Sequence, residues 1–139
     1  MPGKFFLDTN ILVYTFDKSS PVKRNKALAI VGEAIEDQTG VISYQVVQEF
    51  INVASRKFPV PLHPDDLRSY AREILFPLCD IHSSVDLYKK AMDIAGETGF
   101  SFYDCLIIAG ALEAGCRTLY SEDLQSGRSL NGLRIVNPF

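Results

Sequence analysis

Two acidic residues of the sequence follow segments that we expect to be short strands. Asp8 comes directly after the apolar run at 5–7, and Asp123 comes shortly after the expected strand at 118–120. Short continuous apolar runs are typical of strands buried on both faces of a parallel sheet, and such sheets bind ligands at the carboxyl ends of their strands. Both acids are therefore candidates for a site. Asp also caps helices and closes Asx-turns, which would explain either residue without chemistry.

A third acid, Asp104, falls in a segment that we expect to be a helix over residues 102–114. At ~100° per residue, Asp104 and Glu113 lie on opposite faces of that helix. Every residue at 105–112 is apolar or glycine, so Glu113 marks the solvated face and Asp104 is predicted to face inward. A buried carboxylate is costly unless a cation or hydrogen-bond donors compensate it. Ser101 and Asp104 also fit a capping box, which is compatible with metal binding.

The fourth acid, Glu49, lies in an expected helix at 44–57, on the border between its apolar arc and its polar arc. A glutamate on a solvated surface would occupy the same position. Near the carboxyl end of the expected strand at 118–120, Glu122 is an alternative to Asp123. Ser121 is expected either to support the acids with its hydroxyl or to cap a helix.

Together, these acids indicate one chemistry if they meet in one crevice. Carboxylates that lie within a few Å of one another repel unless highly charged cations sit between them. Ligand sets made only of oxygen select Mg²⁺ or Mn²⁺, which also bind substrate phosphates. One ion would lower the pKa of a bound water, and a second, ~4 Å away, would stabilise the leaving oxygen. The sequence therefore predicts metal-dependent hydrolysis of phosphodiesters by Asp8, Glu49, Asp104 and Asp123.

The elements that would position these acids alternate along the chain. Pro21 is expected to open the first helix and Gly40 to close it, while Ser83 and Gly99 are expected to begin and end the helix at 85–98. Strands that alternate with helices imply a parallel sheet with helices on both faces. We therefore expect a single α/β domain over residues 1–139, a three-layer sandwich with a central parallel sheet of four to five short strands. The expected strands are 5–7, 41–42, 79–81, 118–120 and 133–136, and the remaining helix is 64–77.

Composition favours an ordinary globular domain over a fibrous, disordered or membrane-spanning chain. The 139 residues are 47% hydrophobic and 22% charged. The apolar run at 105–112 is much shorter than the ~20 residues that a membrane span needs. No secretory signal is recognisable near the N-terminus, and three cysteines without a CxxC pair suit reduced thiols. A cytoplasmic protein with no membrane partner is expected.

The net charge of −3 argues against a nucleic-acid partner. That objection weakens because the net charge would become slightly positive without the four site acids. Lys23, Arg24 and Lys26 surround an expected helix N-terminus, where the helix dipole disfavours cations. An external anion such as an RNA phosphate would explain these three residues, and a solvated helix face is the other explanation.

Four segments of the sequence resemble the motifs of the PIN-domain nucleases, in the order and spacing of that family. They are FFLDTNILVYTFD, ISYQVVQEFINV, GFSFYDCLIIAGALEAGC and TLYSEDLQSG. The match spans nearly the whole chain. Within the family, the chain most resembles the VapC-like ribonuclease toxins of type II toxin–antitoxin systems.

The resemblance implies an activity, a site and partners. The activity is that of an endoribonuclease that cuts RNA with Mg²⁺ or Mn²⁺. The ions would be bound by Asp8, Glu49, Asp104 and Asp123, with Thr9 and Ser121 as supporting residues. The resemblance also implies a homodimer, neutralised by a cognate antitoxin whose tail enters the active-site groove.

Two other classes of function fit parts of the pattern. A receiver-like signalling module also combines an α/β fold with an acidic Mg²⁺ pocket, and Asp80 falls where its phosphoacceptor would stand. No Lys-Pro pair occurs in the chain to complete that pattern. A catalytically silent RNA-binding or interaction module would keep the fold alone. Saturable Mn²⁺ binding and EDTA-sensitive cleavage would distinguish the nuclease from the silent module.

Overall fold

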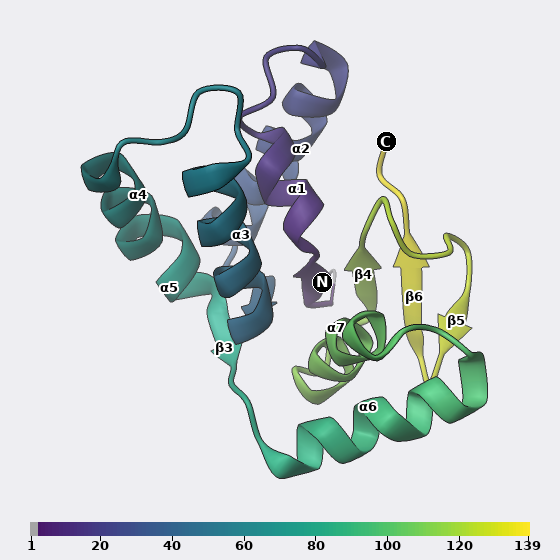
Figure 1. Cartoon of the computed structure of the whole chain (residues 1–139). Helices are drawn as coiled ribbons and strands as arrows, with labels where there is room; N and C mark the ends of the chain where they lie inside the picture. The colour runs from purple at the N-terminus through teal and green to yellow at the C-terminus, as the bar shows by residue number, and fades with distance from the viewer. Residues whose placement is uncertain (1–2) are drawn as a thin grey trace.

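A six-stranded sheet forms the centre of the computed structural model, which describes residues 3–139 (Figure 1). The strands lie in the order β3-β2-β1-β4-β6-β5, and every neighbouring pair is parallel except β5 and β6. The expected parallel sheet is confirmed, with one short antiparallel strand, β5, added at its edge. The described strands are β1 (Phe5–Leu7), β2 (Gly40–Ser43), β3 (Cys79–Ile81), β4 (Thr118–Tyr120), β5 (Ser129–Leu130) and β6 (Leu133–Val136).

The central strand, β1, sets the position of the candidate site. All three of its residues are buried, as expected for a strand covered on both faces. Leu7 pairs with Tyr120 at the end of β4, and Asp8 N donates to Tyr120 O at 3.0 Å. The segments that follow β1 and β4 therefore leave the same edge of the sheet side by side.

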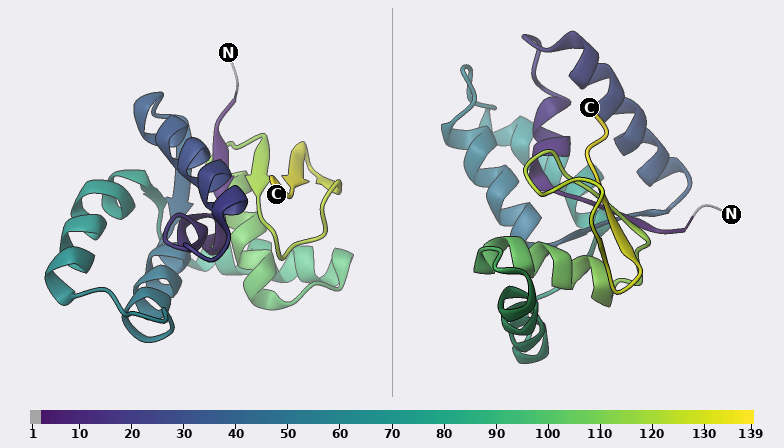
Figure 2. Two further views of the ribbon diagram at one scale, coloured as in Figure 1. Left: turned by 90° about the horizontal axis from the view of Figure 1, so that it is seen from above. Right: turned by 90° about the vertical axis from the view of Figure 1, so that its right-hand side faces the viewer.

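Helices cover both faces of this sheet. On one face α2 packs against β2, and on the other α7 packs against β2 and β4 and is backed by α6 (Figure 2). The three-layer α/β sandwich is therefore confirmed. The described helices are α1 (Thr9–Tyr14), α2 (Pro21–Glu36), α3 (Tyr44–Arg56), α4 (Pro64–Tyr70), α5 (Phe76–Leu78), α6 (Val85–Thr98) and α7 (Phe102–Glu113), with a π-helical turn, Ala71–Leu75, between α4 and α5.

The cap of α6 differs from the one expected. Ser84 caps this helix, not Ser83, because the Ser84 Oγ accepts a hydrogen bond from Leu87 N at 3.0 Å. The other end is confirmed: Gly99 follows the last turn with a φ of 76°. A left-handed residue at this position is the common way to end a helix.

The expected role of Gly40 is wrong. The helix α2 already ends at Glu36, and Gly40 instead begins β2. A Cβ atom at Gly40 would lie 2.2 Å from the Cβ of Ala34 on α2. Glycine is needed here because the helix and the strand approach closely, not because a helix terminates.

One helix, α1, lies in a segment for which the sequence predicted none. It begins directly after β1, with Asp8 as its N-cap. An aromatic cluster holds its far end: the ring of Phe16 lies 5.9 Å from Phe50, 5.5 Å from Phe58 and 5.2 Å from Tyr70, between centroids. These contacts tie α1 to α3 and α4, and so fix the helix that carries the residues after Asp8.

The three cysteines are free thiols, as the sequence indicates. Within residues 3–139, the helices are too short or too polar for any of them to cross a membrane.

Candidate metal centre

Asp8 is buried at the junction of β1 and α1, where two donors hold its carboxylate. Only 8% of the residue is exposed. Its Oδ1 accepts from Thr9 N at 2.8 Å, and its Oδ2 accepts from Ser121 Oγ at 2.7 Å. Asp8 therefore caps α1, as one of the two explanations of this residue predicts. Capping alone does not explain the burial of a carboxylate, because caps work equally well at exposed positions.

The electrostatic surroundings of Asp8 are unfavourable to its charge. Burial raises the pKa of Asp8 from 3.8 to about 6, against the opposing effect of the hydrogen bonds from Ser121 and Thr9. The negative charges of Glu49 and Asp123 raise this pKa further. Three of the four predicted acids therefore share one electrostatic environment, although they come from three separate segments. Such an arrangement is typical of sites that bind cations.

Glu49, on α3, is tied to the β1–α1 junction. The Thr9 hydroxyl donates to Glu49 Oε2 at 2.7 Å, and Gln45 Nε2 donates to Glu49 Oε1 at 2.9 Å. Glu49 is half-buried, as its border position predicts. Each oxygen has one donor that orients it and lone pairs left for a cation.

Asp123 and Glu122, in the segment after β4, point to different partners. Asp123 Oδ2 accepts from Asn10 Nδ2 at 3.1 Å, beside the other acids. Glu122 accepts from the Tyr14 hydroxyl at 2.6 Å and from Lys23 Nζ at 2.7 Å. These two partners, Lys23 first, lower the pKa of Glu122. Asp123 thus faces the acids, whereas Glu122 is held in an ion pair with α2.

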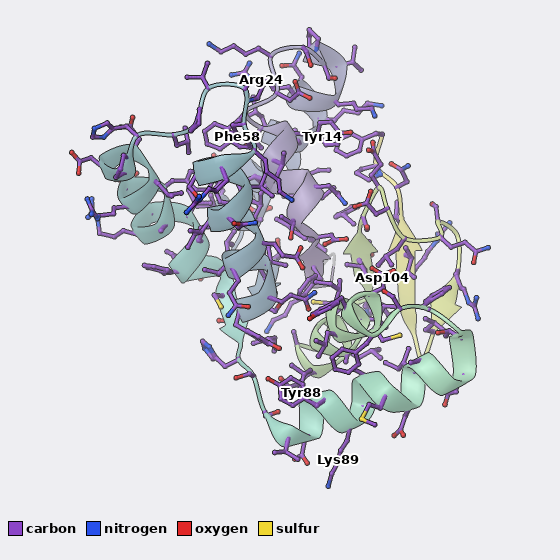
Figure 3. All side chains as sticks on the ribbon, viewed as in Figure 1. Tyr14, Arg24, Phe58, Tyr88, Lys89 and Asp104 are labelled. Carbon is purple, nitrogen blue, oxygen red and sulfur yellow. The ribbon has the colours of Figure 1, made fainter. Side chains whose placement is uncertain are left out.

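Asp104 stands in the first turn of α7, on the side of that helix away from α6 (Figure 3). It is half-buried while Glu113 is exposed. The two residues differ in exposure in the expected direction, but Asp104 is less buried than an inward-facing residue would be. Its N–H donates to Ser101 Oγ at 3.2 Å, so Ser101 caps α7. Within residues 3–139, no hydrogen bond reaches the Asp104 carboxylate, so the second half of the capping box is not formed.

Gln45 connects Asp104's neighbourhood to the other acids. Its Nε2 donates both to Glu49 Oε1 and, at 3.2 Å, to the carbonyl oxygen of Tyr103, the residue before Asp104. Gln45 is buried, and its Oε1 has no hydrogen-bond partner. Sequence reasoning missed this residue. The available signal was its position four residues before Glu49, which places both side chains on one face of a helix.

Asn10 is a second residue whose role the sequence did not reveal. Besides its bond to Asp123, its Oδ1 accepts from Glu122 N at 3.2 Å. One amide side chain on α1 therefore holds both the backbone and the acid of the segment after β4. Its place two residues after Asp8 was the only sequence signal.

The chemistry of these side chains fits a hard divalent cation, since the donors are carboxylate oxygens. Among residues 3–139, no three His, Cys, Asp or Glu side chains lie close enough together to enclose an ion. In proteins Mg²⁺ keeps several waters and is usually bound directly by one or two carboxylates. The residues that could contribute are Asp8, Glu49, Asp104 and Asp123.

A cavity of about 420 Å³ opens beside the acids, between α1 and α3. Its lining residues are Thr9, Asn10, Val13, Glu49, Asn52, Val53, Lys57 and Asp123. A larger cavity of about 780 Å³, between α3 and α4, has no acidic side chain in its lining. The smaller cavity is therefore the one that belongs to the candidate site.

The three basic residues at the start of α2 have partly internal explanations. Lys23 forms the ion pair with Glu122, and Arg24 Nε donates to Thr15 O at 3.2 Å. Lys26 is exposed. Contacts within the chain therefore account for Lys23 and Arg24 without an external anion. RNA binding by Lys23, Arg24 and Lys26 stays a prediction.

The pattern that defines the PIN domain matches residues 5–126 of the chain. The chain therefore belongs to the PIN-domain family, as its four motifs indicate. This assignment replaces the receiver-like alternative.

Solved structures similar to this chain come from toxin–antitoxin systems. A toxin-antitoxin complex from Klebsiella pneumoniae aligns with a TM-score of 0.69 and 20% identity over 98% of each chain. DNA-bound VapBC from Salmonella typhimurium aligns at 0.67 and 18% over 99% of each chain. VapC20 from Mycobacterium tuberculosis, described as a sarcin-ricin loop cleaving toxin, aligns at 0.61 and 18% over 86% of this chain and 90% of that chain. These likenesses establish a VapC-like toxin fold. No curated protein matches the sequence at a significant level.

Proposed function

We propose that this protein is an endoribonuclease that hydrolyses RNA phosphodiester bonds with Mg²⁺ or Mn²⁺. The observation that carries the proposal is the buried Asp8, whose pKa is raised to about 6 by its burial and by the charges of Glu49 and Asp123. A divalent cation would remove that electrostatic cost. The fold supports the same activity, because PIN domains are typically nucleases and one similar structure is described as a cleaving toxin.

Asp8, Glu49, Asp104 and Asp123 would hold the metal, with Asp123 rather than Glu122 as the fourth acid. Bound metal would supply an activated water and stabilise the leaving oxygen. The chain's own residues orient the ligands. Ser121 and Thr9 N hold the two oxygens of Asp8, and the Thr9 hydroxyl holds Glu49. Such outer hydrogen bonds are usually worth 10–100-fold in metal affinity or activity, as an order of magnitude.

The partners of the protein are proposed from its relatives. Similar structures are described as toxin–antitoxin complexes or as VapBC. We propose that this chain is the toxin of such a type II pair, that it acts in the cytoplasm as a homodimer, and that a cognate antitoxin blocks its site. A neighbouring reading frame for a small DNA-binding protein, and its copurification with this chain, would test the pairing.

Cleavage of transfer, ribosomal and messenger RNA with Mn²⁺ tests the activity. The wild-type protein should cut at least one of these RNAs, and EDTA should stop it. Asp8→Asn and Asp104→Asn should each abolish cutting, while Glu113→Gln, at the exposed end of α7, should not. Undiminished cleavage by both Asn variants would overturn the assignment. Wild-type protein that neither binds Mn²⁺ saturably nor cleaves would be a silent module.

A further inference from the structure

The cavity beside the acids extends well beyond them along α3. Glu49 and Asp123 lie in its lining together with Asn52 and Lys57. Lys57 is the C-cap of α3, eight residues after Glu49, which corresponds to ~12 Å along the helix axis. Stacked nucleotides rise ~3.4 Å each, so the cavity is longer than one nucleotide. It therefore has room for more substrate than the phosphate at the acids.

Charged side chains of both signs line this cavity. The acids Glu49 and Asp123 line it, and so does Lys57, which lies at the C-terminal end of α3. Asn52 and Lys57 are both exposed. Within residues 3–139, Lys57 takes part in no ion pair, since those present involve Lys23, His63 and Arg68. Its charge is therefore available to an external anion.

The helix dipole offers a simpler reason for a cation at the end of α3, because cations are favoured near helix C-termini. That reason applies equally to Arg56, which is also exposed at the end of α3. Only Lys57 lines the cavity that contains the acids. The helix dipole thus explains why both residues are basic. It does not explain why Lys57 lines the cavity of the candidate site.

We propose that this cavity binds the RNA backbone on one side of the cut, with Lys57 and Asn52 contacting a phosphate about three nucleotides from the scissile one. The proposal rests on the proposed ribonuclease function. Lys57 pairs with the phosphate oxygens as a point charge, and the Asn52 amide donates a hydrogen bond to them. These contacts place the scissile phosphate at the acids and fix the direction in which the strand crosses α3.

The test compares Lys57→Gln with Arg56→Gln, which removes the same charge from the neighbouring exposed residue. Binding of labelled single-stranded RNA is measured over a range of salt concentrations, and KM and kcat are measured with Mn²⁺. Lys57→Gln should weaken binding and raise KM roughly 5-fold, with a salt slope smaller by ~0.7, the value for one phosphate of a single strand. Arg56→Gln should change the binding constant far less. Lys89→Gln, on α6 and pointing away from the site in Figure 3, controls for net charge.

A second arm identifies the phosphate. RNAs in which single phosphates are replaced, one at a time, by uncharged methylphosphonates are tested for binding. One methylphosphonate about three nucleotides from the cut should weaken binding to the wild type and have no further effect on Lys57→Gln, because the two changes remove the same contact. Asn52→Ala should bind unmodified RNA more weakly than the wild type does. A methylphosphonate at the same position should not weaken its binding further.

The outcomes separate this inference from the proposed function. RNA cleavage by the wild type, together with equal RNA binding by Lys57→Gln and Arg56→Gln, would overturn the backbone path and leave the nuclease intact. A wild type that binds RNA but never cleaves it would refute the nuclease. If Lys57→Gln then loses RNA binding and Arg56→Gln does not, the backbone path would still be supported. Absence of RNA binding would overturn the path and leave the cavity to another occupant, such as a protein segment.

Discussion

Ser121 Oγ lies 2.7 Å from Asp8 Oδ2, although the two residues are 113 positions apart in the chain. The contact forms because β1 and β4 are adjacent parallel strands that end in register. It gives Asp8 a donor but no positive charge, and burial still raises the pKa of the carboxyl to about 6. Asp8 is therefore an ordered acid that favours a bound proton or cation over an uncompensated charge.

Replacement of Asp8 by Asn should stabilise the metal-free protein at neutral pH. The pKa of Asp8 is about 6 in the folded chain against 3.8 ordinarily, so the folded state binds this proton more tightly than the unfolded chain. The stability that the protonated Asp8 contributes is fully present below pH ~4. Up to about 3 kcal/mol of it is lost as the pH rises through ~6. Urea denaturation in EDTA at several pH values measures the difference between Asp8→Asn and wild type.

That difference should be largest above neutral pH and should shrink as the pH falls towards ~4. The exposed Glu113→Gln serves as the control, with no such pH dependence expected. A stability difference that is zero at every pH would mean that the Asp8 charge is not buried at a cost.

Metal affinity should also depend on pH. A proton and a metal ion compete for Asp8, so Mn²⁺ binding should weaken as the pH falls below about 6. At neutral pH, Mn²⁺ at about 100 times its Kd should stabilise the wild type by ~2.7 kcal/mol, and EDTA should reverse the effect. Thermal unfolding with and without Mn²⁺ measures this, with Asp8→Asn expected to show no shift. If Mn²⁺ stabilised the protein equally at acid and neutral pH, Asp8 would not be a ligand of the ion.

Asp123→Asn and Glu122→Gln should have very different effects on RNA cleavage, although the two residues are adjacent. Asn10 donates a hydrogen bond to Asp123 and holds it beside the other acids. The cleavage rate of Asp123→Asn should therefore fall by more than the roughly 10–100-fold expected for a merely supporting residue. Glu122 is paired with Lys23, so its variant should keep most of its activity and lose ~0.2–1 kcal/mol of stability. Cleavage rates and urea denaturation provide both measurements. The reverse order of activities would make Glu122 the ligand.

Gln45→Met should weaken Mn²⁺ binding and RNA cleavage by about 10–100-fold. The methionine fills a similar volume but cannot donate, so Glu49 loses one donor and the Tyr103 carbonyl loses its partner. The control is Gln48→Met, the same change at an exposed position of the same helix. Titration calorimetry with Mn²⁺ measures the affinity. Equal affinities for the two variants would show that Gln45 does not position the site.

Most helices and strands could be predicted from local signals. Pro21 at the start of α2, Ser101 at the cap of α7 and Gly99 after α6 act as expected. The hairpin strand β5 was missed despite a signal: Asn131 and Gly132 have φ values of 51° and 85°, and an Asn-Gly pair is typical of tight hairpins. The helix α1 was missed because six residues give too short a window for helical periodicity, and its first residues also favour turns.

The candidate site was predictable to the extent that it depends on one element at a time. The sheet-edge rule placed Asp8 near the segment after β4, and helical spacing predicted that Asp104 is less exposed than Glu113. The role of Gln45 could not be predicted, because it depends on how closely α3 approaches the start of α7. Long-range packing of that kind leaves no periodic mark in the sequence.

The register of β1 makes the chain unequally tolerant of changes in length. An extra residue inside β1 would shift Asp8 by one step, and successive strand side chains point to opposite faces. The carboxylate would then turn away from Ser121, and every bond at the β1–α1 junction would be lost. The same insertion at 82–84, an exposed link between β3 and α6, would only lengthen a connection. Natural length variation in relatives of this chain should therefore be absent from β1 and common in that link.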